Sequence, residues 1–330
     1  MARMTAQQRE VERLLTRLEP RVAAAFADAI QAARRNVDFA ALIEALERGD
    51  LNAAIRLLDV PQALLFPLED AVRAAYIEGG AMVAVAAPQA LIGFGGSSPS
   101  AQAWLRELSS VRIQGIREDT LEATRIALEA GREQGMGSRE MATMIVGKRV
   151  GNRREGGILG LTTQIADSIM TARAKLLSGD PALMAEYLEL KLRDRRYDRT
   201  IKKAIAEGRR LTVKEVDAIL DAHKSKALAY RGKVIAKNET FQALEAGRYE
   251  AVRQALENPD VAKGVCRWQH NLSQEPRLDH VSMSGTVVEF GQDFVFPDGA
   301  RMKHPHDPAG GARMNLGCRC IGIWRIVMKA

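Results

Sequence analysis

Hydrophobic residues recur at helical spacing along most of the first 260 residues. The first such stretch follows Thr5 and Gln8, whose spacing is that of a capping box. It predicts an amphipathic helix at the N-terminus, and any kink in it is expected at Pro20. Its apolar positions are Val11, Leu14, Leu15, Leu18, Val22, Ala25, Phe26, Ala29 and Ile30.

The same periodicity predicts a series of further helices. A stretch rich in Gly, Ser and Pro that ends near Ser100 indicates a loop or hinge between them. Thr212 and Glu215 form a second capping box. The expected helices are two short ones that end before Gly49 and Pro61, then Trp104–Ala130, Met141–Val146 after an N-cap at Ser138, Leu161–Leu177, 182–206, one after Thr212, and a last one reaching Val252.

The pattern changes after Asn258-Pro259, where short β-like runs replace the helical periodicity. These runs are 286–290, 293–296 and 321–327, and aromatic residues such as Trp268 and Trp324 are their main apolar anchors. The chain is therefore predicted to be mainly α. We expect an N-terminal helical region at 1–140, a central helical region at 141–260 and a small C-terminal α+β module at 261–330.

Composition supports helices and argues against a membrane or secreted protein. Hydrophobic residues make up 46% of the chain and aromatic residues only 5%. The longest apolar run, 81–92, has 12 residues and contains a proline, whereas a membrane span needs about 20. The N-terminus becomes charged where a signal peptide needs an apolar core. Three cysteines, an odd number, do not suggest a disulfide framework.

Positive charge is concentrated in one segment. Residues 191–237 contain 15 Lys and Arg against 6 Asp and Glu, so the segment carries +9 while the rest of the chain carries −2. Such a field attracts DNA phosphates or an acidic protein, although a solvated helix face has the same appearance. The basic, glycine-rich stretch at 147–157 has the spacing of neither a phosphate-binding loop nor a dinucleotide-binding motif.

Cysteine and histidine are concentrated at the C-terminus. All three cysteines and four of the five histidines lie in the last 65 residues. Cys318 and Cys320 are two residues apart and would point to one side of a strand, so we expect them to bind zinc together with Cys266 and His280. His304 or His306 can substitute for one of these ligands. The alternative is a hydrogen-bonded polar cluster without metal.

The order of several segments resembles the head-morphogenesis, or minor head, proteins of Mu-like and related tailed phages. The resemblance covers roughly residues 157–327 and is most specific at the C-terminus. It rests on the strings "GLTTQIADSI", "RDRRYDRTI" and "VIAKNETFQALEAGRYEAVRQA", then on Arg277, His280, Gly285, Asp307-Pro308 and Cys318-Arg319-Cys320. It implies that Arg277 pairs with Glu275, unless Arg277 lies on a solvated rim. Unlike many relatives, this chain has no CxxC pair near the arginine, and His304-Pro305 lies 14 residues before Cys318.

The resemblance implies a structural protein of the virion head with no enzymatic activity. Its partners would be the portal, scaffold or major capsid protein, and packaged DNA through residues 191–237. We expect several copies per particle, in the host cytoplasm during assembly and in the phage head afterwards. Two other functions are considered. One is a DNA-binding adaptor, and the other is a metal-dependent nuclease built from His270, Asp279, His280, His304, His306 and Asp307.

Overall fold

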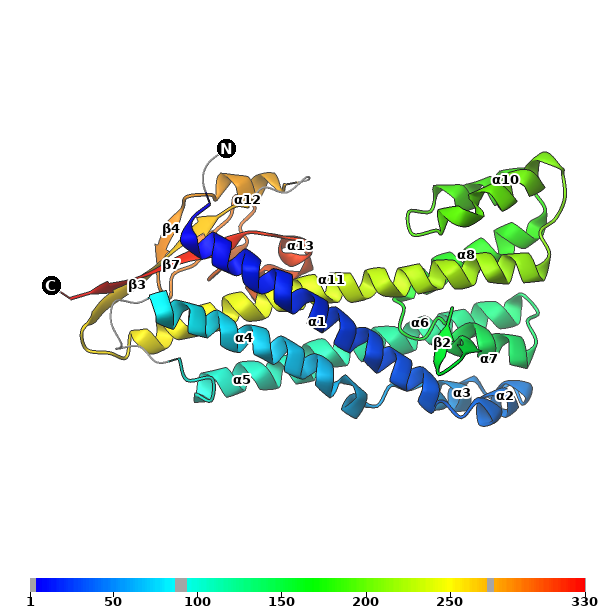
Figure 1. Cartoon of the computed structure of the whole chain (residues 1–330), viewed down its shortest axis with the longest axis horizontal. Helices are drawn as coiled ribbons and strands as arrows, with labels where there is room; N and C mark the ends of the chain where they lie inside the picture. The colour runs from blue at the N-terminus through cyan, green and yellow to red at the C-terminus, as the bar shows by residue number, and fades with distance from the viewer. Residues whose placement is uncertain (1–3, 87–93, 272–275, 330) are drawn as a thin grey trace. The chain divides into compact units, whose positions relative to one another are not determined.

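The computed structural model describes residues 4–86, 94–271 and 276–329 (Figure 1). It confirms a mainly helical chain with a small C-terminal α+β region. The helices are α1 (Ala6–Asn36), α2 (Phe39–Glu47), α3 (Leu51–Leu57), α4 (Phe66–Ala86), α5 (Pro99–Glu107), α6 (Gln114–Glu133), α7 (Ser138–Val146), α8 (Thr163–Ser178), α9 (Pro181–Glu186), α10 (Asp198–Ala206), α11 (Val213–Ala255), α12 (Leu278–Ser282) and α13 (Gly311–Asn315). The strands are β1 (Lys148–Val150), β2 (Arg153–Glu155), β3 (Val261–Gln269), β4 (Val287–Glu289), β5 (Phe294–Val295), β6 (Arg301–Met302) and β7 (Ile321–Met328).

Both predicted capping boxes begin long helices. The Thr5 amide donates to Gln8 Oε1 at 2.7 Å, and the Gln8 amide donates to Thr5 Oγ1 at 3.1 Å. Thr212 and Glu215 make the same reciprocal pair at 2.8 and 3.2 Å. Helix α1 continues through Pro20. Helix α11 joins the two last predicted helices into one of 43 residues, because the polar stretch between them contains no residue that stops a helix.

The chain forms two compact units, each made of separate pieces of sequence. Unit 1 comprises 1–24, 68–110 and 233–330, and unit 2 comprises 25–67 and 111–232. This division differs from the three consecutive regions expected from the sequence. The physical reason is that α1 and α11 are long enough to contribute residues to both units, so no single cut in the sequence separates the cores.

Unit 1 contains the C-terminal module, whose sheet has the antiparallel order β4-β3-β7. In the central strand β3, Gly264, Cys266 and Trp268 are buried at alternate positions, as expected when one face of a sheet packs on a core. Cys266 pairs with Trp324 of β7 and with Val288 of β4. A second, two-residue ladder joins β5 and β6. The two long strands, β3 and β7, contribute Trp268 and Trp324 to a hydrophobic cluster that also contains Phe294 and Phe296.

Helices α4 and α11 touch through two glycines. A Cβ atom added at Gly247 would lie 1.9 Å from the carbonyl oxygen of Tyr76, and one added at Gly79 would lie 2.2 Å from that of Leu244. Both are far inside van der Waals contact with backbone atoms, which cannot move aside as a side chain can. The two helices therefore pack backbone to backbone at this point.

We expect Gly247→Ala to lower the free energy of unfolding by about 1–3 kcal/mol, the usual cost of overpacking. The matched control is Gly115→Ala in α6, where nothing lies within 4 Å of the added Cβ and where alanine should stabilise the helix by up to about 1 kcal/mol. Urea denaturation followed by circular dichroism measures both changes. Equal effects of the two substitutions would contradict the close helix contact.

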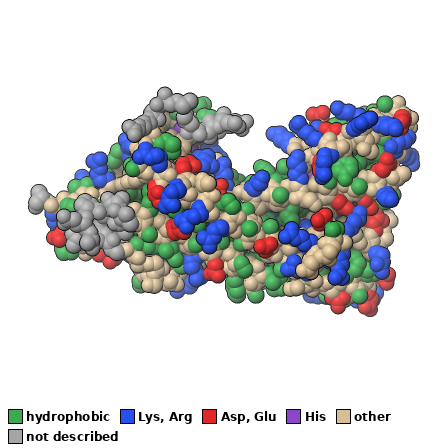
Figure 2. Space-filling view, viewed as in Figure 1, with side chains coloured by type: hydrophobic (Ala, Val, Ile, Leu, Met, Phe, Trp, Pro, Cys, Tyr) green, Lys and Arg blue, Asp and Glu red, His purple; other side chains and the backbone are tan. Residues whose placement is uncertain are grey.

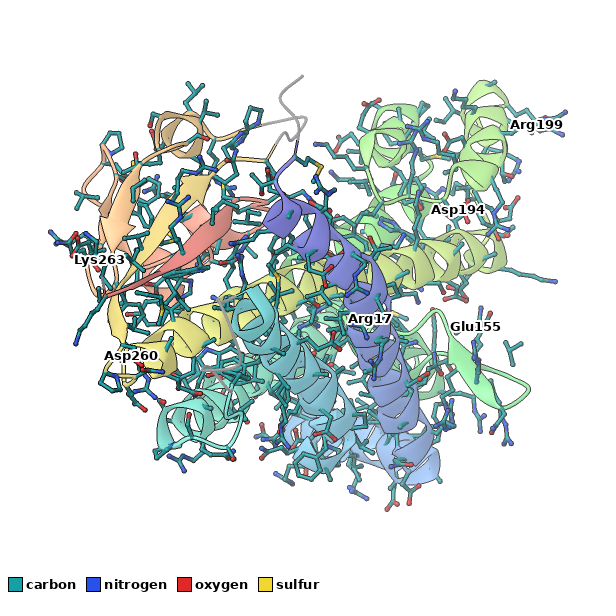
Figure 3. The ribbon with its side chains drawn as sticks, turned by 60° about the vertical axis from the view of Figure 1, so that its left-hand side comes forward. Arg17, Glu155, Asp194, Arg199, Asp260 and Lys263 are labelled. Atoms are coloured by element: carbon teal, nitrogen blue, oxygen red, sulfur yellow. The ribbon has the colours of Figure 1, made fainter. Side chains whose placement is uncertain are left out.

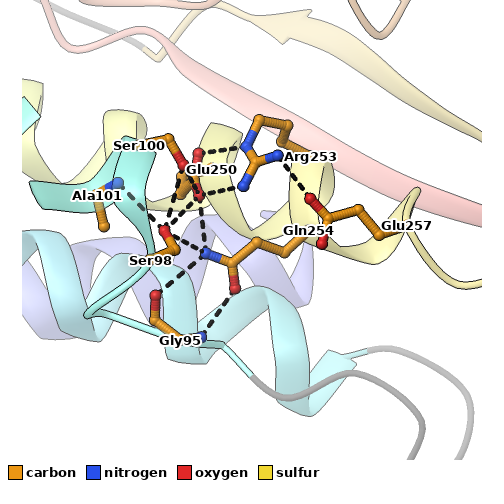
Figure 4. A network of polar contacts seen from close by, with 8 residues as sticks. All are labelled: Gly95, Ser98, Ser100, Ala101, Glu250, Arg253, Gln254 and Glu257. Carbon is orange, nitrogen blue, oxygen red and sulfur yellow. Dashed lines mark hydrogen bonds and ion pairs between the residues drawn. The ribbon is translucent and has the colours of Figure 1, made fainter. Parts of the chain in front are cut away.

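A polar network holds the start of α5 against the end of α11 (Figure 4). The buried Glu250 carboxylate accepts hydrogen bonds from Ser98 at 3.0 Å, from Ser100 at 2.6 Å, from Arg253 at 2.8 and 2.9 Å and from Gln254 at 2.8 Å. Burial raises the pKa of Glu250, but these donors outweigh it and lower the pKa to about 2. The carboxylate therefore stays ionised inside the network.

The network should make unit 1 sensitive to acid. Because the folded pKa of Glu250, about 2, lies below its ordinary value of 4.5, its contribution is complete above about pH 5 and is lost as the pH falls towards 2. Because solvent screens part of these interactions, the loss should be about 1–2 kcal/mol. Glu250→Gln should remove most of this pH dependence, measured as unfolding free energies between pH 7 and pH 3. The exposed Glu257→Gln is the control and should leave it in place.

Unit 2 is built around two buried arginines. Arg34 of α1 donates to the carbonyl oxygens of Gly157 and Leu159, and Arg231 of α11 donates to those of Gly160 and Leu161. These bonds satisfy the buried backbone between β2 and α8. The glycine-rich stretch before this segment forms the antiparallel hairpin of β1 and β2. Among the described residues of both units, no helix is long and apolar enough to cross a membrane.

Candidate metal centre

Three of the four predicted metal ligands meet in the core of the C-terminal module. His280 lies on α12, where its ring packs edge-on against Trp268 with centroids 5.5 Å apart. Cys318 and Cys320 lie in the segment that leads into β7, after a turn at Gly317 with φ +71°. Strand-like alternation places both cysteines on the same side of the chain. The tertiary fold thus brings His280 next to Cys318 and Cys320, which lie 38 and 40 positions further along the chain.

The three donor atoms are close together and shielded from solvent. His280 Nδ1 lies 3.3 Å from Cys318 Sγ and 3.5 Å from Cys320 Sγ, and all three ligand atoms lie within 4.8 Å of one another. The residues are exposed by only 2%, 5% and 2%, respectively. The Cys320 amide also donates to Cys318 Sγ at 3.3 Å. This group can bind a metal ion.

The environments of the two sulfur atoms differ. The hydrogen bond between the thiols lowers the pKa of Cys318 and raises that of Cys320, and the neighbouring His306 and His280 lower the pKa of Cys318 further. The surroundings of Cys318 therefore favour its thiolate, which is the form of cysteine that binds metals.

The chemistry of the donor atoms in the group suits a metal ion. Nε2 of His306, a neighbour of Cys318, is buried without a hydrogen-bond partner among the described residues. Buried polar atoms are seldom left unsatisfied, because each costs about 1–3 kcal/mol. Two sulfurs and an imidazole nitrogen form a soft donor set, which selects zinc over magnesium or calcium.

Cys266, the fourth predicted ligand, does not belong to the group. In the register of the sheet, Cys266 lies opposite Trp324, whereas Cys320 precedes Ile321, the partner of Gln269. Cys320 is four positions before Trp324, and the Cys266 sulfur lies beside Gly322, 2.9 Å from where a Cβ atom of residue 322 would stand. The Cys266 thiol lies near Glu245 of α11 instead, and burial raises its pKa well above the usual value. The sequence could not show that Cys266 lies apart from the other three predicted ligands, because that depends on the register of the sheet.

The other histidines occupy different environments. His304 Nδ1 lies 2.8 Å from the carbonyl oxygen of Pro305, and its ring tilts against Tyr249. His306 lies next to Cys318 and stacks on Phe241. His270 is half-buried and lies outside the His280 group.

Two further residues of the C-terminal sequence pattern serve the local backbone. Asp307 accepts hydrogen bonds from the amides of Lys303 at 2.7 Å and Ala309 at 2.9 Å, which places its carboxylate in a turn. Arg277 donates to the carbonyl oxygen of Leu316 at 2.6 Å, which ties α12 to the segment before Cys318. Glu275, its expected partner, lies outside the described residues.

A buried ion pair beside the sheet was not found by sequence reasoning. Glu245 and Arg248 of α11 are fully buried and 2.5 Å apart. Arg248 also donates to Gln7 Oε1 at 2.8 Å, and Glu245 accepts from the Gly322 amide at 3.3 Å. Gln7 in turn bonds both the amide and the carbonyl of Trp324. In the sequence this ion pair is indicated only by the spacing of three residues between its glutamate and its arginine. The same spacing is common for ion pairs on solvent-exposed helices, so it does not indicate burial.

The structure separates the basic segment into buried and exposed charges. Arg231 is buried, and Lys224 is buried beside Asp221 at 2.9 Å. By contrast, Arg195, Arg199 and Lys202 follow at helical spacing from the turn before α10 into that helix, are exposed and have no ion pair within the described residues. We call these three residues the α10 patch. Lys and Arg side chains gather over α10 in Figure 2, and Figure 3 shows Arg199 extending away from it.

Comparisons with known proteins give little further information. No family model matches the chain, and no solved structure matches it. The chain is 27% identical over 92 residues to the uncharacterized protein YqbB of Bacillus subtilis (strain 168). This match covers 28% of this chain and 29% of that relative.

Proposed function

We propose that this chain is a structural component of a phage head, a minor head protein whose C-terminal module is held together by bound zinc. The observation that carries the proposal is the buried group of His280, Cys318 and Cys320. These residues belong to the stretch in which the resemblance to minor head proteins is most specific. The family likeness and the candidate metal centre thus involve the same side chains.

Zinc would act in this module as a cross-link. It would join α12 to the segment before β7, two parts of the chain between which all the helices and strands are five residues long or shorter. A small module gains folding free energy from such a link, because the site forms only when the chain is folded. The role of His280, Cys318 and Cys320 is then to hold the ion away from water, and no substrate has to reach it.

A structural role is tested by particle association. A tagged chain expressed in cells that produce the phage should sediment with heads or their precursors and should capture portal, scaffold or major capsid protein. We expect Cys318→Ser to reduce this association, because the module would lose its cross-link. The exposed Arg13→Gln in α1 is a control that should leave it unchanged. Absence of the wild-type chain from heads and precursors would contradict the proposal.

The α10 patch supports contact with packaged DNA or with an acidic head protein. Arg195, Arg199 and Lys202 have no carboxylate partner within the described residues, so their charge is available to an anionic surface. Replacing all three by Gln should weaken DNA binding and flatten its salt dependence, because fewer counterions are released. DNA affinity measured at several salt concentrations tests this, and unchanged affinity would favour an acidic protein partner.

The nuclease alternative has a direct assay. If His280 activated water at a metal, the purified chain would cleave DNA when a divalent cation is added, and His280→Ala would abolish cleavage. We expect no cleavage, because the His280 ring is buried against Trp268 and Phe296 and a nucleic-acid phosphate has no access to it.

A further inference from the structure

His306 is held in an unusual backbone conformation. Its φ is +64°, and within the described residues it is the one non-glycine residue with a positive φ. Histidine is tolerated there, but the conformation is unfavourable and persists only when the surrounding structure enforces it. Such strain is concentrated at active sites, ligand-binding sites and switch regions.

The side chain of His306 is fixed by its neighbours. It is 1% exposed and stacks on Phe241 of α11, with ring centroids 4.6 Å apart and an angle of 18° between the planes. The following turn is fixed as well, because Asn315 Nδ2 donates to the carbonyl oxygen of Asp307 at 2.6 Å. The imidazole is therefore placed beside Cys318 by both its ring and its backbone.

The imidazole lacks a partner for one of its nitrogens. Nε2 of His306 is buried and makes no hydrogen bond within the described residues, although the ring is close enough to Cys318 to affect that thiol. His304, two residues earlier, already uses its Nδ1 on the carbonyl oxygen of Pro305. Of the two histidines, His306 is the one with a nitrogen that needs a partner and that lies next to the candidate metal centre.

We propose that His306 is the fourth ligand of the zinc ion, which gives a site of two cysteines and two histidines: His280, His306, Cys318 and Cys320. This inference rests on the proposed zinc cross-link and identifies its complete donor set. His306 is not part of the compact group whose ligand atoms lie within 4.8 Å of one another, so the three donors of that group would shift towards the fixed His306 ring when the ion binds. Four donors of this kind match the closed, tetrahedral coordination of structural zinc.

The donor set also assigns a role to each element around the site. Helix α12 supplies His280, the turn before α13 supplies His306, and the segment before β7 supplies both sulfurs. Phe241 lies behind His306, so α11 acts as the support of the site. Cys266 is left as a buried thiol of the sheet that binds no metal.

Metal titration of the purified full-length chain tests the inference. Zinc affinity is measured by competition with a chromophoric chelator, and cobalt(II) replaces zinc to report the ligands by absorption. We expect one ion per chain, a tetrahedral cobalt spectrum with two thiolates, and a loss of affinity greater than about 100-fold in His306→Ala, since even an outer partner of a metal ligand is worth 10–100-fold. Cys266→Ala and His304→Ala are matched controls that should keep the wild-type affinity and spectrum.

His306→Cys distinguishes loss of a ligand from loss of folding. Cysteine can bind zinc in place of histidine, so this variant should retain tight binding, and its thiolate-to-cobalt band should grow because a third sulfur is present. If wild-type protein binds neither zinc nor cobalt, the zinc cross-link itself is wrong. If wild-type protein binds the metal while His306→Ala keeps the same affinity and cobalt spectrum, the cross-link stands and His306 is not a ligand. A weaker thiolate band in Cys266→Ala would overturn the assignment in favour of Cys266.

Discussion

Removal of zinc should lower the free energy of unfolding of the C-terminal module by about 4 kcal/mol when free zinc had been a thousandfold above its dissociation constant. The reason is that the folded chain brings His280, Cys318 and Cys320 within 4.8 Å of one another, whereas the unfolded chain presents no such site. Thermal unfolding with and without a strong chelator measures the effect. The fluorescence of Trp268 and Trp324, which lie in this module, reports its unfolding.

Cysteine variants make this test specific. Cys318→Ser should lower the stability of the zinc-loaded protein to that of the chelated wild type, and added chelator should then have no further effect. Cys266→Ala should remain as sensitive to the chelator as the wild type, because Cys266 lies outside the group. If the chelator leaves the unfolding of wild-type protein unchanged, the module does not depend on metal.

Arg248→Ala should cost about 3–5 kcal/mol, the usual effect of removing one partner of a buried ion pair. The Glu245 carboxylate would remain fully buried but would lose the cation that neutralises it. Gln7, which contacts β7, would lose the hydrogen bond that Arg248 donates to it. Because these contacts connect α11, α1 and the sheet, we expect the loss in unit 1 as a whole. Chemical denaturation of the variant and the wild type gives the difference.

The matched control is another arginine that pairs with a glutamate three residues before it. Arg13 and Glu10 have the same spacing, also on a helix, but their side chains are 63% and 39% exposed. Arg13→Ala should therefore change stability by no more than about 1 kcal/mol. A loss in Arg248→Ala as small as that in Arg13→Ala would show that the buried pair contributes little. In that case, replacing both Glu245 and Arg248 by apolar residues should be tolerated.

The local sequence was sufficient for most of the helices. The hydroxyl and carboxamide of Thr5 and Gln8, and the equivalent groups of Thr212 and Glu215, act on amides only three residues away, so no tertiary information is needed to locate them. The β-like runs after Asn258 were identified for the same reason, since alternation along a strand is a local property. Concentration of Cys and His at the C-terminus likewise pointed to the correct part of the chain for a candidate metal centre.

Local patterns could not show which distant residues meet. Division into two units depends on how α1 and α11 pack along their length, and residues far apart in sequence decide that packing. The separation of Cys266 from the His280 group depends on strand register, and the position of His306 depends on a single turn with positive φ; neither leaves a signal in side-chain type. The same holds for the basic segment. Arg231 and Arg199 are both arginines on predicted helices, yet Arg231 is buried and Arg199 is exposed, and the sequence pattern does not distinguish them.

The amino-acid sequence by itself determined the helices, their caps, the change to a small α+β module and the side chains able to bind a metal, because each depends on neighbours within a few positions. Only the tertiary structure decided which of those side chains are brought together, which cations face solvent, and where a buried carboxylate needs an arginine. These outcomes depend on packing and desolvation between distant segments, and those energies are defined only once the chain has folded.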